Sequence, residues 1–550
     1  MNLSKSKYTR ALQCPKMLWM DYFKPELAED NAAAVFAVGN EVGDLARQYF
    51  GDYSLVDFDA GFDAMLEQTK ELMVQGVENI AEASFAVDGL FCSVDILHKT
   101  PTGWDLVEVK SSTHLKDVYL DDMAFQYFVL TQCGVRISGV YNLHVNSHYV
   151  RRGDLDLKEL FTKEDCTEIV LRKQAGVAIN IADIRRYMAR CDDFEPERDI
   201  GPWCESPYKC AYYNYCARHL PTNNVFDLQR FASDKKYDLY YRGIVSFEDI
   251  LEHDVKLNQA QLLQVKSAVE HLPPHVDKKG IRDFLAQLTY PLYHLDFETY
   301  QPAVPQHDGE RPYMQVPFQY SLHIQRAPGA EPEHREHLGV AGTDPRRALA
   351  EQLCRDIPQD VCSLAYNMKF EKGVIRALAE QFPDLADHLM NIHDNMKDLM
   401  LPFQKKYYYS EAMGNSYSIK VVLPALFPDD PALDYHNLEG IHNGSEAMAA
   451  FPDLQNHTPE EQETIRKNLL AYCGLDTYAM VKVLEKLYEL AGIGDIAMSD
   501  DEKLAAMRFC STGVGTEFVG DKEKIKKIQK EVREKIDIIL NEQKDNGDNT

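Results

Sequence analysis

The sequence predicts a multidomain α/β protein, and three observations support this prediction. With 550 residues, the chain is long enough for about three domains with sizeable cores. Strand-like segments are followed by helical periodicity in two separate regions, before about residue 220 and between residues 286 and 490. A polar stretch of helical periodicity separates the two regions, which indicates a helical connector.

The first region, residues 1–220, begins with a helical stretch and closes on a segment rich in cysteine and tyrosine. Between these ends we expect strands over about residues 85–109 and a helix over about residues 120–133. The connector spans residues 221–285 and ends at a proline-marked turn in the segment HLPPHVDKKG.

The second α/β region spans residues 286–490, where strands and helices alternate. For residues 491–550 we expect a surface helix followed by a polar tail. The apolar side chains that recur at helical spacing there are Ile525, Ile528, Val532, Ile536 and Ile539.

The composition is ordinary for a globular protein, but the formal net charge is −28. This charge argues against an extended basic surface for nucleic acid. It does not exclude a nucleic-acid enzyme, because a metal-dependent phosphodiesterase concentrates carboxylates in its site. No apolar run approaches the ~18 residues of a membrane span, and the first residues lack the apolar stretch of a secretion signal. We therefore expect a cytoplasmic protein with no membrane partner.

The segment YHLDFETY carries an acid, skips one residue and carries a second acid. Side chains alternate between the two faces of a strand, so Asp296 and Glu298 share one face while Leu295 and Phe297 share the other. Two carboxylates on one face indicate a divalent metal site or an acid/base pair. The alternative is a half-exposed edge strand with solvated acids.

Four of the twelve cysteines are arranged as a possible metal-ligand set. Cys204, Cys210 and Cys216 lie close together with proline and aromatic residues between them, and Cys14 would complete a set of four thiolates. Four thiolates also suit tetrahedral zinc. The paired CxxC knuckles of many zinc sites are absent, which favours an iron–sulfur cluster. The other eight cysteines, such as Cys92 and Cys473, are scattered and are expected to be core residues.

A carboxylate–lysine pattern lies in the first region. Asp95 falls on one predicted strand, and Glu108 and Lys110 share a face of the next strand, so the three side chains can converge. The two carboxylates would hold Mg²⁺ or Mn²⁺, and the lysine would orient or help to deprotonate the attacking water. The alternative is a pair of surface strands with an ion pair.

Residues 1–220 resemble the PD-(D/E)xK nucleases, specifically the RecB-like branch that carries a [4Fe–4S] cluster and includes the CRISPR adaptation exonucleases. The resemblance implies a restriction-endonuclease-like core, with the four cysteines above as cluster ligands. It also gives Gln126 the place of a glutamine on the helix after the core, although Leu130 stands where the family often has tyrosine. Glu41 stands where many relatives place a metal-binding histidine, and the Cys204–Cys210 gap is longer than usual.

Two further segments lie downstream of the acid–skip–acid strand. In NLLAYCGLDTYAM, Tyr472 and Asp476 are four residues apart and therefore share one helix face. In SLAYNMKFEKGVIRAL, Asn367, Phe370 and Glu371 begin a predicted helix after a short apolar strand. The alternative for the first pair is a solvated helix face.

In this order, the three segments resemble the DEDD exonucleases of the RNase H-like fold, in the subclass whose last motif is Tyr-x3-Asp. The resemblance covers about residues 288–490. It implies that Asp296 bridges two metal ions, that Glu298 and Asp476 complete the first, and that Tyr472 orients water. Glu371 stands where the family has aspartate and would serve the second metal. Asp394 or Asp398 could take its place.

The combination of both domains resembles an uncharacterised bacterial family that joins a RecB-like nuclease to a DEDD exonuclease. It implies a metal-dependent nuclease with two active sites, acting on DNA in repair or in defence against foreign DNA. One alternative is an RNA 3′-5′ exonuclease. Another is a nucleic-acid-binding scaffold with one or both sites inactive. The sequence predicts no particular protein partner.

Overall fold

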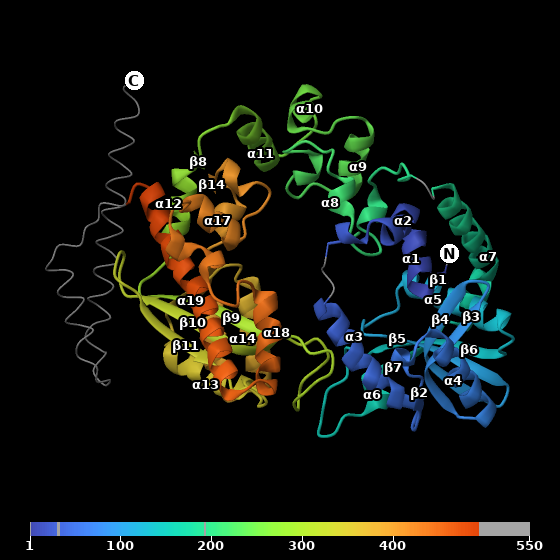
Figure 1. Cartoon of the computed structure of the whole chain (residues 1–550). Coiled ribbons are helices and arrows are strands. Elements are labelled where there is room, and N and C mark those ends of the chain that lie inside the picture. Colours follow the sequence, from blue (N-terminus) through green and yellow to red (C-terminus); the bar gives the residue numbers. More distant parts are fainter. Residues whose placement is uncertain (1, 30–32, 192–193, 494–550) are drawn as a thin grey trace. The chain divides into compact units, whose positions relative to one another are not determined.

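The computed structural model describes residues 2–29, 33–191 and 194–493 (Figure 1). It confirms an α/β protein with two mixed sheets, one of seven strands and one of five. The helix and polar tail predicted for residues 491–550, including Ile525 to Ile539, lie almost entirely outside the described residues. Among the helices that are described, none is both long and apolar enough to cross a membrane.

The larger sheet has the strand order β2-β3-β4-β5-β6-β7, with β1 beside β4. Its pairings are antiparallel from β3 to β5 and between β6 and β7, and parallel between β5 and β6. Its strands are β1 (Leu3–Ser4), β2 (Ser54–Leu55), β3 (Asn79–Val87), β4 (Leu90–Thr100), β5 (Gly103–Lys110), β6 (Ile137–Val145) and β7 (Phe161–Asp165). The strand-like stretch predicted over residues 85–109 is thus the end of β3, the whole of β4 and most of β5.

The helices of the first region are α1 (Lys5–Gln13), α2 (Pro15–Phe23), α3 (Ala33–Ala46), α4 (Phe62–Gln75), α5 (Asp117–Gln132), α6 (Leu157–Leu160), α7 (Thr167–Arg190) and α8 (Tyr213–Cys216). The sequence predicted α5 to within a few residues. This helix is buried on most sides because it lies between the larger sheet and helices α1 and α7.

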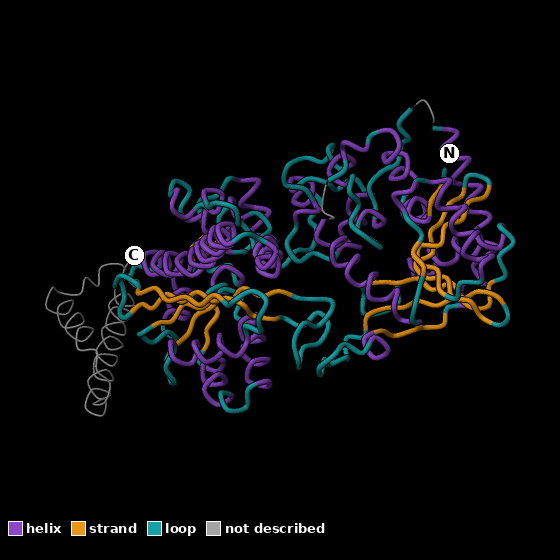
Figure 2. The backbone as a smooth tube through the Cα atoms, turned by 60° about the horizontal axis from the view of Figure 1, so that its bottom comes forward, coloured by secondary structure: helices purple, strands orange, loops and turns teal. Residues whose placement is uncertain are grey.

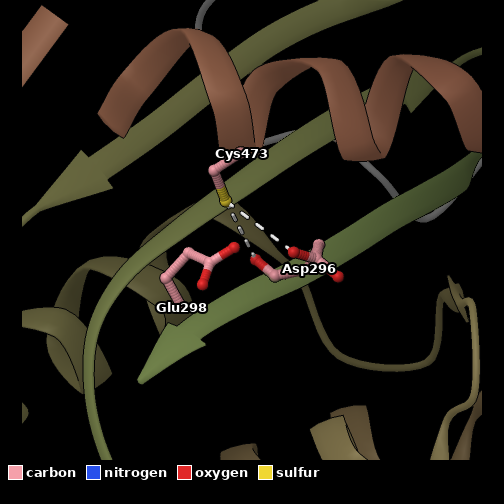
Figure 3. A group of neighbouring side chains, drawn as sticks. All are labelled: Asp296, Glu298 and Cys473. Carbon is pink, nitrogen blue, oxygen red and sulfur yellow. Dashed lines mark hydrogen bonds between the residues drawn. The ribbon is translucent and has the colours of Figure 1, made fainter. Parts of the chain in front are cut away.

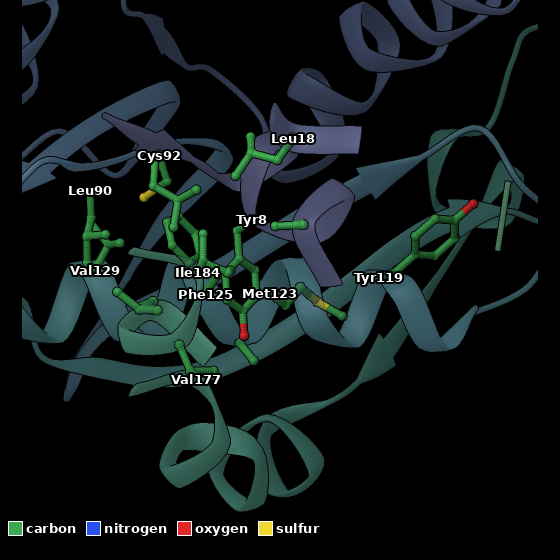
Figure 4. Packing of buried hydrophobic residues seen from close by; sticks show 14 of the residues in the cluster. Tyr8, Leu18, Leu90, Cys92, Tyr119, Met123, Phe125, Val129, Val177 and Ile184 are labelled. Carbon is green, nitrogen blue, oxygen red and sulfur yellow. The ribbon is translucent and has the colours of Figure 1, made fainter. Parts of the chain in front are cut away.

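The core of the first region shows how β5 presents its side chains. Leu106 belongs to the cluster that contains α5 residues, whereas Val107 belongs to a second cluster with residues of α3. Because side chains alternate along β5, Glu108 faces α5 together with Leu106. On this side of the sheet, Tyr8 of α1 stacks on Phe125 of α5 with ring centroids 4.7 Å apart (Figure 4).

The connector is helical, as the sequence predicts. It contains α9 (Ser233–Tyr241), α10 (Phe247–Glu252), α11 (Gln259–Glu270), β8 (His275–Val276) and α12 (Lys278–Leu285). Residues 225–268 bury a small apolar cluster of their own. Capping boxes at Ser246 and Asn258 satisfy the first backbone N–H groups of α10 and α11.

The smaller sheet has the strand order β11-β10-β9-β12-β13. The strands β9, β10 and β11 pair antiparallel, whereas β12 and β13 run parallel to β9. Its strands are β9 (Leu292–Tyr300), β10 (Val316–Gln325), β11 (Glu333–Leu338), β12 (Cys362–Ala365) and β13 (Met396–Asp398). A short strand outside this sheet, β14 (Tyr408–Tyr409), pairs with β8 of the connector.

Helices cover both faces of the smaller sheet (Figure 2). The helices of this region are α13 (Arg346–Asp356), α14 (Lys369–Gln381), α15 (Ala386–Asp394), α16 (Leu401–Gln404), α17 (Ile419–Leu426), α18 (Gly444–Asp453) and α19 (Pro459–Leu490). Leu295 and Phe297 pack in a cluster with residues of α13, α14 and α15. The opposite face of β9 lies against α18 and α19. The predicted alternation along β9 is therefore confirmed.

Candidate active sites

The first candidate site forms where β4, β5 and α5 meet. Lys110 Nζ donates to Glu108 Oε1 at 2.6 Å, and Gln126 Nε2 donates to Glu108 Oε2 at 2.6 Å. Asp95 Oδ2 accepts the backbone N–H of Val109 at 2.7 Å. The structure thus brings together Asp95, Glu108, Lys110 and Gln126.

Two residues that the sequence analysis did not select complete this cluster. Lys5 Nζ, from the first turn of α1, lies 3.3 Å from Asp95 Oδ1 and 3.2 Å from each carboxylate oxygen of Glu108. Asp122 of α5 accepts hydrogen bonds from Lys110 at 3.0 Å and from Gln126 at 3.0 Å. The carboxylates of the first cluster therefore face two ammonium groups.

The two ammonium groups divide the charge unequally between the carboxylates. Burial and the Glu108 charge raise the pKa of Asp95 to about 7. Burial also acts to raise the pKa of Glu108, but Lys110 and Lys5 outweigh it and hold that pKa below its usual range. Glu108 is the ionised centre of the cluster, with a side chain only 1% exposed.

Glu41 does not join this cluster. Its side chain is exposed on α3, and it forms no hydrogen bond or ion pair with Asp95, Glu108 or Lys110 in the part of the chain that the structure describes. The next residue, Val42, packs in the cluster that contains Val107, on the face of β5 opposite Glu108.

The second candidate site forms between β9, the first turn of α14 and the middle of α19. It brings together four acidic residues, and the exposed fractions are 8% for Glu298, 2% for Glu371 and 8% for Asp476. Asp296 is half-buried. Among the described residues, none of the four forms an ion pair, and Glu371 Oε2 has no hydrogen-bond partner.

The pKa values show that these acids face one another. Burial, followed by the charges of Asp476 and Glu371, raises the pKa of Asp296 well above its ordinary value. Burial and the charge of Asp476 raise the pKa of Glu298 to about 8. Burial also raises the pKa of Glu371 to about 8 and that of Asp476 to about 6. The cluster therefore lacks the positive charge that would let all four acids ionise.

Polar side chains from neighbouring elements surround the acids. Tyr472 accepts a hydrogen bond from Lys420 of α17 at 3.1 Å, and Lys420 also donates to the carbonyl oxygen of His442 at 3.1 Å. Tyr435 donates to Asp476 Oδ1 at 2.6 Å. The start of α18 borders the site, since a Cβ placed on Gly444 would lie 3.7 Å from Glu298 Oε2. The sequence analysis missed Lys420 and Tyr435.

Cys473 also reaches this site, although the sequence placed it among the core residues. It is fully buried, but its Sγ lies 3.8 Å from Asp296 Oδ2 and 3.9 Å from the carbonyl oxygen of Asp296 (Figure 3). Three possible ligand atoms lie within 4.8 Å of one another, one each from Cys473, Asp296 and Glu298.

Asp394 and Asp398, the alternatives to Glu371 as a metal ligand, are less well placed than Glu371. Asp394 forms a hydrogen bond with His393 at 2.7 Å, and its side chain is 72% exposed. Asp398 Oδ1 accepts the backbone N–H groups of Asn367 and Met400, each at 3.0 Å. Its charge nevertheless contributes to the raised pKa of Glu371, so Asp398 borders the cluster.

The donors of the second site fit a hard divalent cation. Mg²⁺ and Mn²⁺ prefer carboxylate oxygens, and the site supplies them from three elements. The unpartnered Glu371 Oε2 and the raised pKa values of Asp296 and Glu298 are the features that a bound cation would relieve.

The four cysteines lie around the junction of α1, α2 and α8. Cys14 sits between α1 and α2, and Gln13 ties this junction to the cysteine loop by donating to the carbonyl oxygens of Trp203 and Tyr208, each at 2.7 Å. Burial raises the pKa of Cys210 to about 11, and the neighbouring thiols of Cys204, Cys14 and Cys216 add to the rise. The four side chains thus share one environment. No three of their sulfurs lie within 4.8 Å of one another in the described chain.

Comparison with known families gives one match. A family model described as a domain of unknown function (DUF2779) matches residues 293–418. The match begins in β9 and ends just before α17, so it includes Asp296, Glu298 and Glu371 but not Asp476. No curated protein matches the chain.

Proposed function

We propose that the chain is a metal-dependent nuclease that hydrolyses phosphodiester bonds at two sites and acts as a DNA exonuclease. The observation that carries the proposal is the second cluster, where four buried or half-buried acids from β9, α14 and α19 converge without an ion pair in the described chain. Such an arrangement is costly for a structural role, because unpaired buried carboxylates are destabilising. A role in binding divalent cations would explain why these four acids are gathered without a counter-charge.

At this site each side chain has a separate task. Asp296, Glu298 and Asp476 would hold the metal together, and Glu371 would supply a further oxygen from α14. The bound ions would stabilise the entering and leaving oxygens of the phosphoryl transfer. Tyr472 orients the attacking water through its hydroxyl, which Lys420 holds in place at 3.1 Å. Tyr435 fixes the rotamer of Asp476 through its hydrogen bond at 2.6 Å.

The sheet supports a DEDD-type exonuclease assignment. Three antiparallel strands are followed by two strands parallel to the first, which is compatible with the RNase H-like fold that the motifs resemble. The acid pair lies on the first strand of the domain, and the Tyr-x3-Asp motif lies on the long helix across its face.

For the first cluster we propose a PD-(D/E)xK site. Asp95 and Glu108 would hold the metal, and Gln126 holds Glu108 in position at 2.6 Å. Lys110 would act on the water or on the phosphate. The proposed site leaves out Glu41, whose exposed side chain does not contact the cluster.

We also propose that the four cysteines bind a [4Fe–4S] cluster. The support for this proposal is that Cys210 is buried and that the thiols of Cys204, Cys14 and Cys216 lie near enough to raise its pKa. Protein purified without oxygen should be brown and should lose its colour on the substitution Cys210→Ser. A colourless protein with stoichiometric zinc would contradict the cluster.

The proposed substrate is DNA, because RecB-like iron–sulfur nucleases mostly act on DNA, and the proposed role is repair or defence against foreign DNA. The test is incubation of the full chain with end-labelled single-stranded DNA and RNA, with Mg²⁺ or Mn²⁺ and then with chelator. Chelator-sensitive release of nucleotides from DNA supports the proposal. Preferential release from RNA would favour the RNA 3′-5′ exonuclease instead.

One observation favours a second candidate, a nucleic-acid-binding scaffold in which the first site is inactive. Lys5 contacts both carboxylates that would hold the metal there. Loss of cleavage in the Asp296→Ala variant, with retained binding to DNA, would support this reading for the first site.

A further inference from the structure

The thiol of Cys473 is a donor that the nuclease mechanism does not use. It belongs to α19, one residue after Tyr472, and its Sγ is directed at Asp296 across the space between helix and sheet (Figure 3). The side chain is fully buried, so it is shielded from oxidants and alkylating reagents in solution. Its neighbours on the side of β9 are carboxylates.

The spacing of these atoms suits a tetrahedral metal ion. With bonds of about 2.0–2.3 Å, a tetrahedral zinc ion holds its ligand atoms about 3.3–3.8 Å apart. Cys473 Sγ and Asp296 Oδ2 are already 3.8 Å apart, and Glu298 offers an oxygen within 4.8 Å of the thiol and of an oxygen of Asp296. A small rotation of the Glu298 side chain would complete three ligand positions.

A further observation points to a cation at this place. Glu371 Oε2 is buried without a hydrogen-bond partner in the described chain, and the side chain is only 2% exposed. Its charge acts on Asp296 and Glu298, so it faces the same space. An oxygen of Glu371 or a water molecule could fill the fourth position.

We propose that Zn²⁺ binds in the second site through Cys473, Asp296 and Glu298 and thereby inhibits the nuclease. Thiolate sulfur is a ligand that zinc accepts readily, whereas Mg²⁺ and Mn²⁺ favour oxygen. Binding releases the thiol proton to solvent as the zinc–sulfur bond forms. Zinc would occupy the two carboxylates that the proposed reaction needs. The inhibition, though not the binding, rests on the proposed function.

Binding is tested on the full chain without reference to activity, with Co²⁺ as a spectroscopic substitute for zinc. We expect the parent protein to show a thiolate-to-cobalt charge-transfer band that is weaker by one thiolate in Cys473→Ser. Calorimetry should show that the same substitution lowers Zn²⁺ affinity for this site at least about tenfold. An unchanged band and an unchanged Zn²⁺ affinity would overturn the proposal.

Cys362→Ser is the matched control, because Cys362 is a buried cysteine of β12 whose thiol donates to the carbonyl oxygen of Ser363 rather than to a carboxylate. It should keep the parent spectrum and the parent Zn²⁺ affinity. Cys473→Ala provides a second variant should the serine hydroxyl destabilise the site, and the unfolding temperature in chelator reports the folding of each variant.

The inhibition is tested by adding Zn²⁺ to the Mg²⁺-dependent nuclease reaction. The zinc concentration that halves the rate should rise at least about tenfold in Cys473→Ser. If the parent cleaves DNA and zinc inhibits both proteins equally, the zinc site is wrong and the nuclease stands. If the cobalt band depends on Cys473 but no cleavage is found, the nuclease proposal fails and the zinc site stands.

Discussion

The two carboxylate clusters differ in how their charge is balanced. In the first cluster, Lys5 and Lys110 form ion pairs with Asp95, Glu108 and Asp122 at 2.6–3.3 Å. In the second cluster, no ion pair of the four acids is found among the described residues; the charge of Lys420 acts to lower the pKa of Glu298 and of Asp476, but burial outweighs it, and its ammonium donates to Tyr472. The same kind of residue thus occupies a compensated site and an uncompensated one.

This difference indicates which cluster needs an added metal cation. A buried carboxylate without a counter-charge raises its own pKa and destabilises the fold. The first cluster can remain folded and partly ionised without metal, because its lysines supply the positive charge. The second cluster relieves its repulsion only by taking up protons or metal. We therefore expect the second site to depend more strongly on divalent cations.

The largest expected effect is the loss of activity in Asp296→Ala. We expect exonuclease activity of the second site to fall at least about 10³-fold, because Asp296 is the acid that the other three surround. The measurement is nucleotide release from end-labelled DNA in a Lys110→Ala background, which disables the first site. Asp387→Ala is the control, since this exposed carboxylate of α15 is not a candidate metal ligand. Equal loss in both variants would mean that the assay reports folding.

The next effect is on stability in the presence of Mg²⁺. A ligand at 100 times its dissociation constant stabilises the folded state by about 2.7 kcal/mol. We expect Mg²⁺ to stabilise the parent protein by about this amount and Asp296→Ala to lose most of the stabilisation. Thermal unfolding with and without Mg²⁺ measures both. Tyr472→Phe should retain it, because the carboxylates remain. A full Mg²⁺ response in Asp296→Ala would place the cation in the first cluster.

Two residue pairs of the second cluster were predictable because local rules govern them, whereas Glu371 came only from the resemblance to the DEDD exonucleases. Alternation in a strand placed Asp296 and Glu298 on one face, and the helical period placed Tyr472 and Asp476 on another. Both rules need only the local sequence. The alternation of strands and helices predicted the α/β class for the same reason.

Contacts between segments that are distant in the sequence were not predictable in this way. Lys5 lies 90 residues before Asp95 in a short helix with no distinctive pattern around it. Cys473 lies between two motif residues, yet its sequence environment resembles that of any buried cysteine. The pairing of β8 with β14 likewise joins segments about 130 residues apart. Such contacts depend on how the chain packs, which periodicity does not encode.

The third prediction concerns pH. In chelator, Glu298 and Glu371 have pKa values of about 8 in the folded protein against an ordinary value of 4.5. The folded state then binds more protons than the unfolded chain, so the free energy of unfolding should fall as pH rises from about 4.5 to about 8. For Glu108, whose pKa is lowered, stability is instead lost as pH falls below 4.5.

The measurement is chemical unfolding of the parent and of the double variant Glu298→Gln, Glu371→Gln across this pH range. The difference between the two curves isolates the second cluster, because both proteins share the first. We expect the double variant to be more stable than the parent at pH 8 and the advantage to disappear near pH 4.5. A constant difference would mean that the two acids do not titrate in the folded protein.

The smallest expected effect concerns Lys5, which the comparison makes a competitor of metal in the first cluster. Replacing it in Lys5→Met removes the ammonium from Asp95 and Glu108, and we expect Mg²⁺ affinity there to rise about tenfold, or ~1.4 kcal/mol. Calorimetry in an Asp296→Ala background isolates this binding. Lys7→Met is the control, because Lys7 lies on the same helix and its ammonium contacts the ring of Tyr22 instead. An unchanged or weaker affinity in Lys5→Met would show that Lys5 organises the carboxylates for metal, and the two clusters would then differ in charge without differing in their need for a cation.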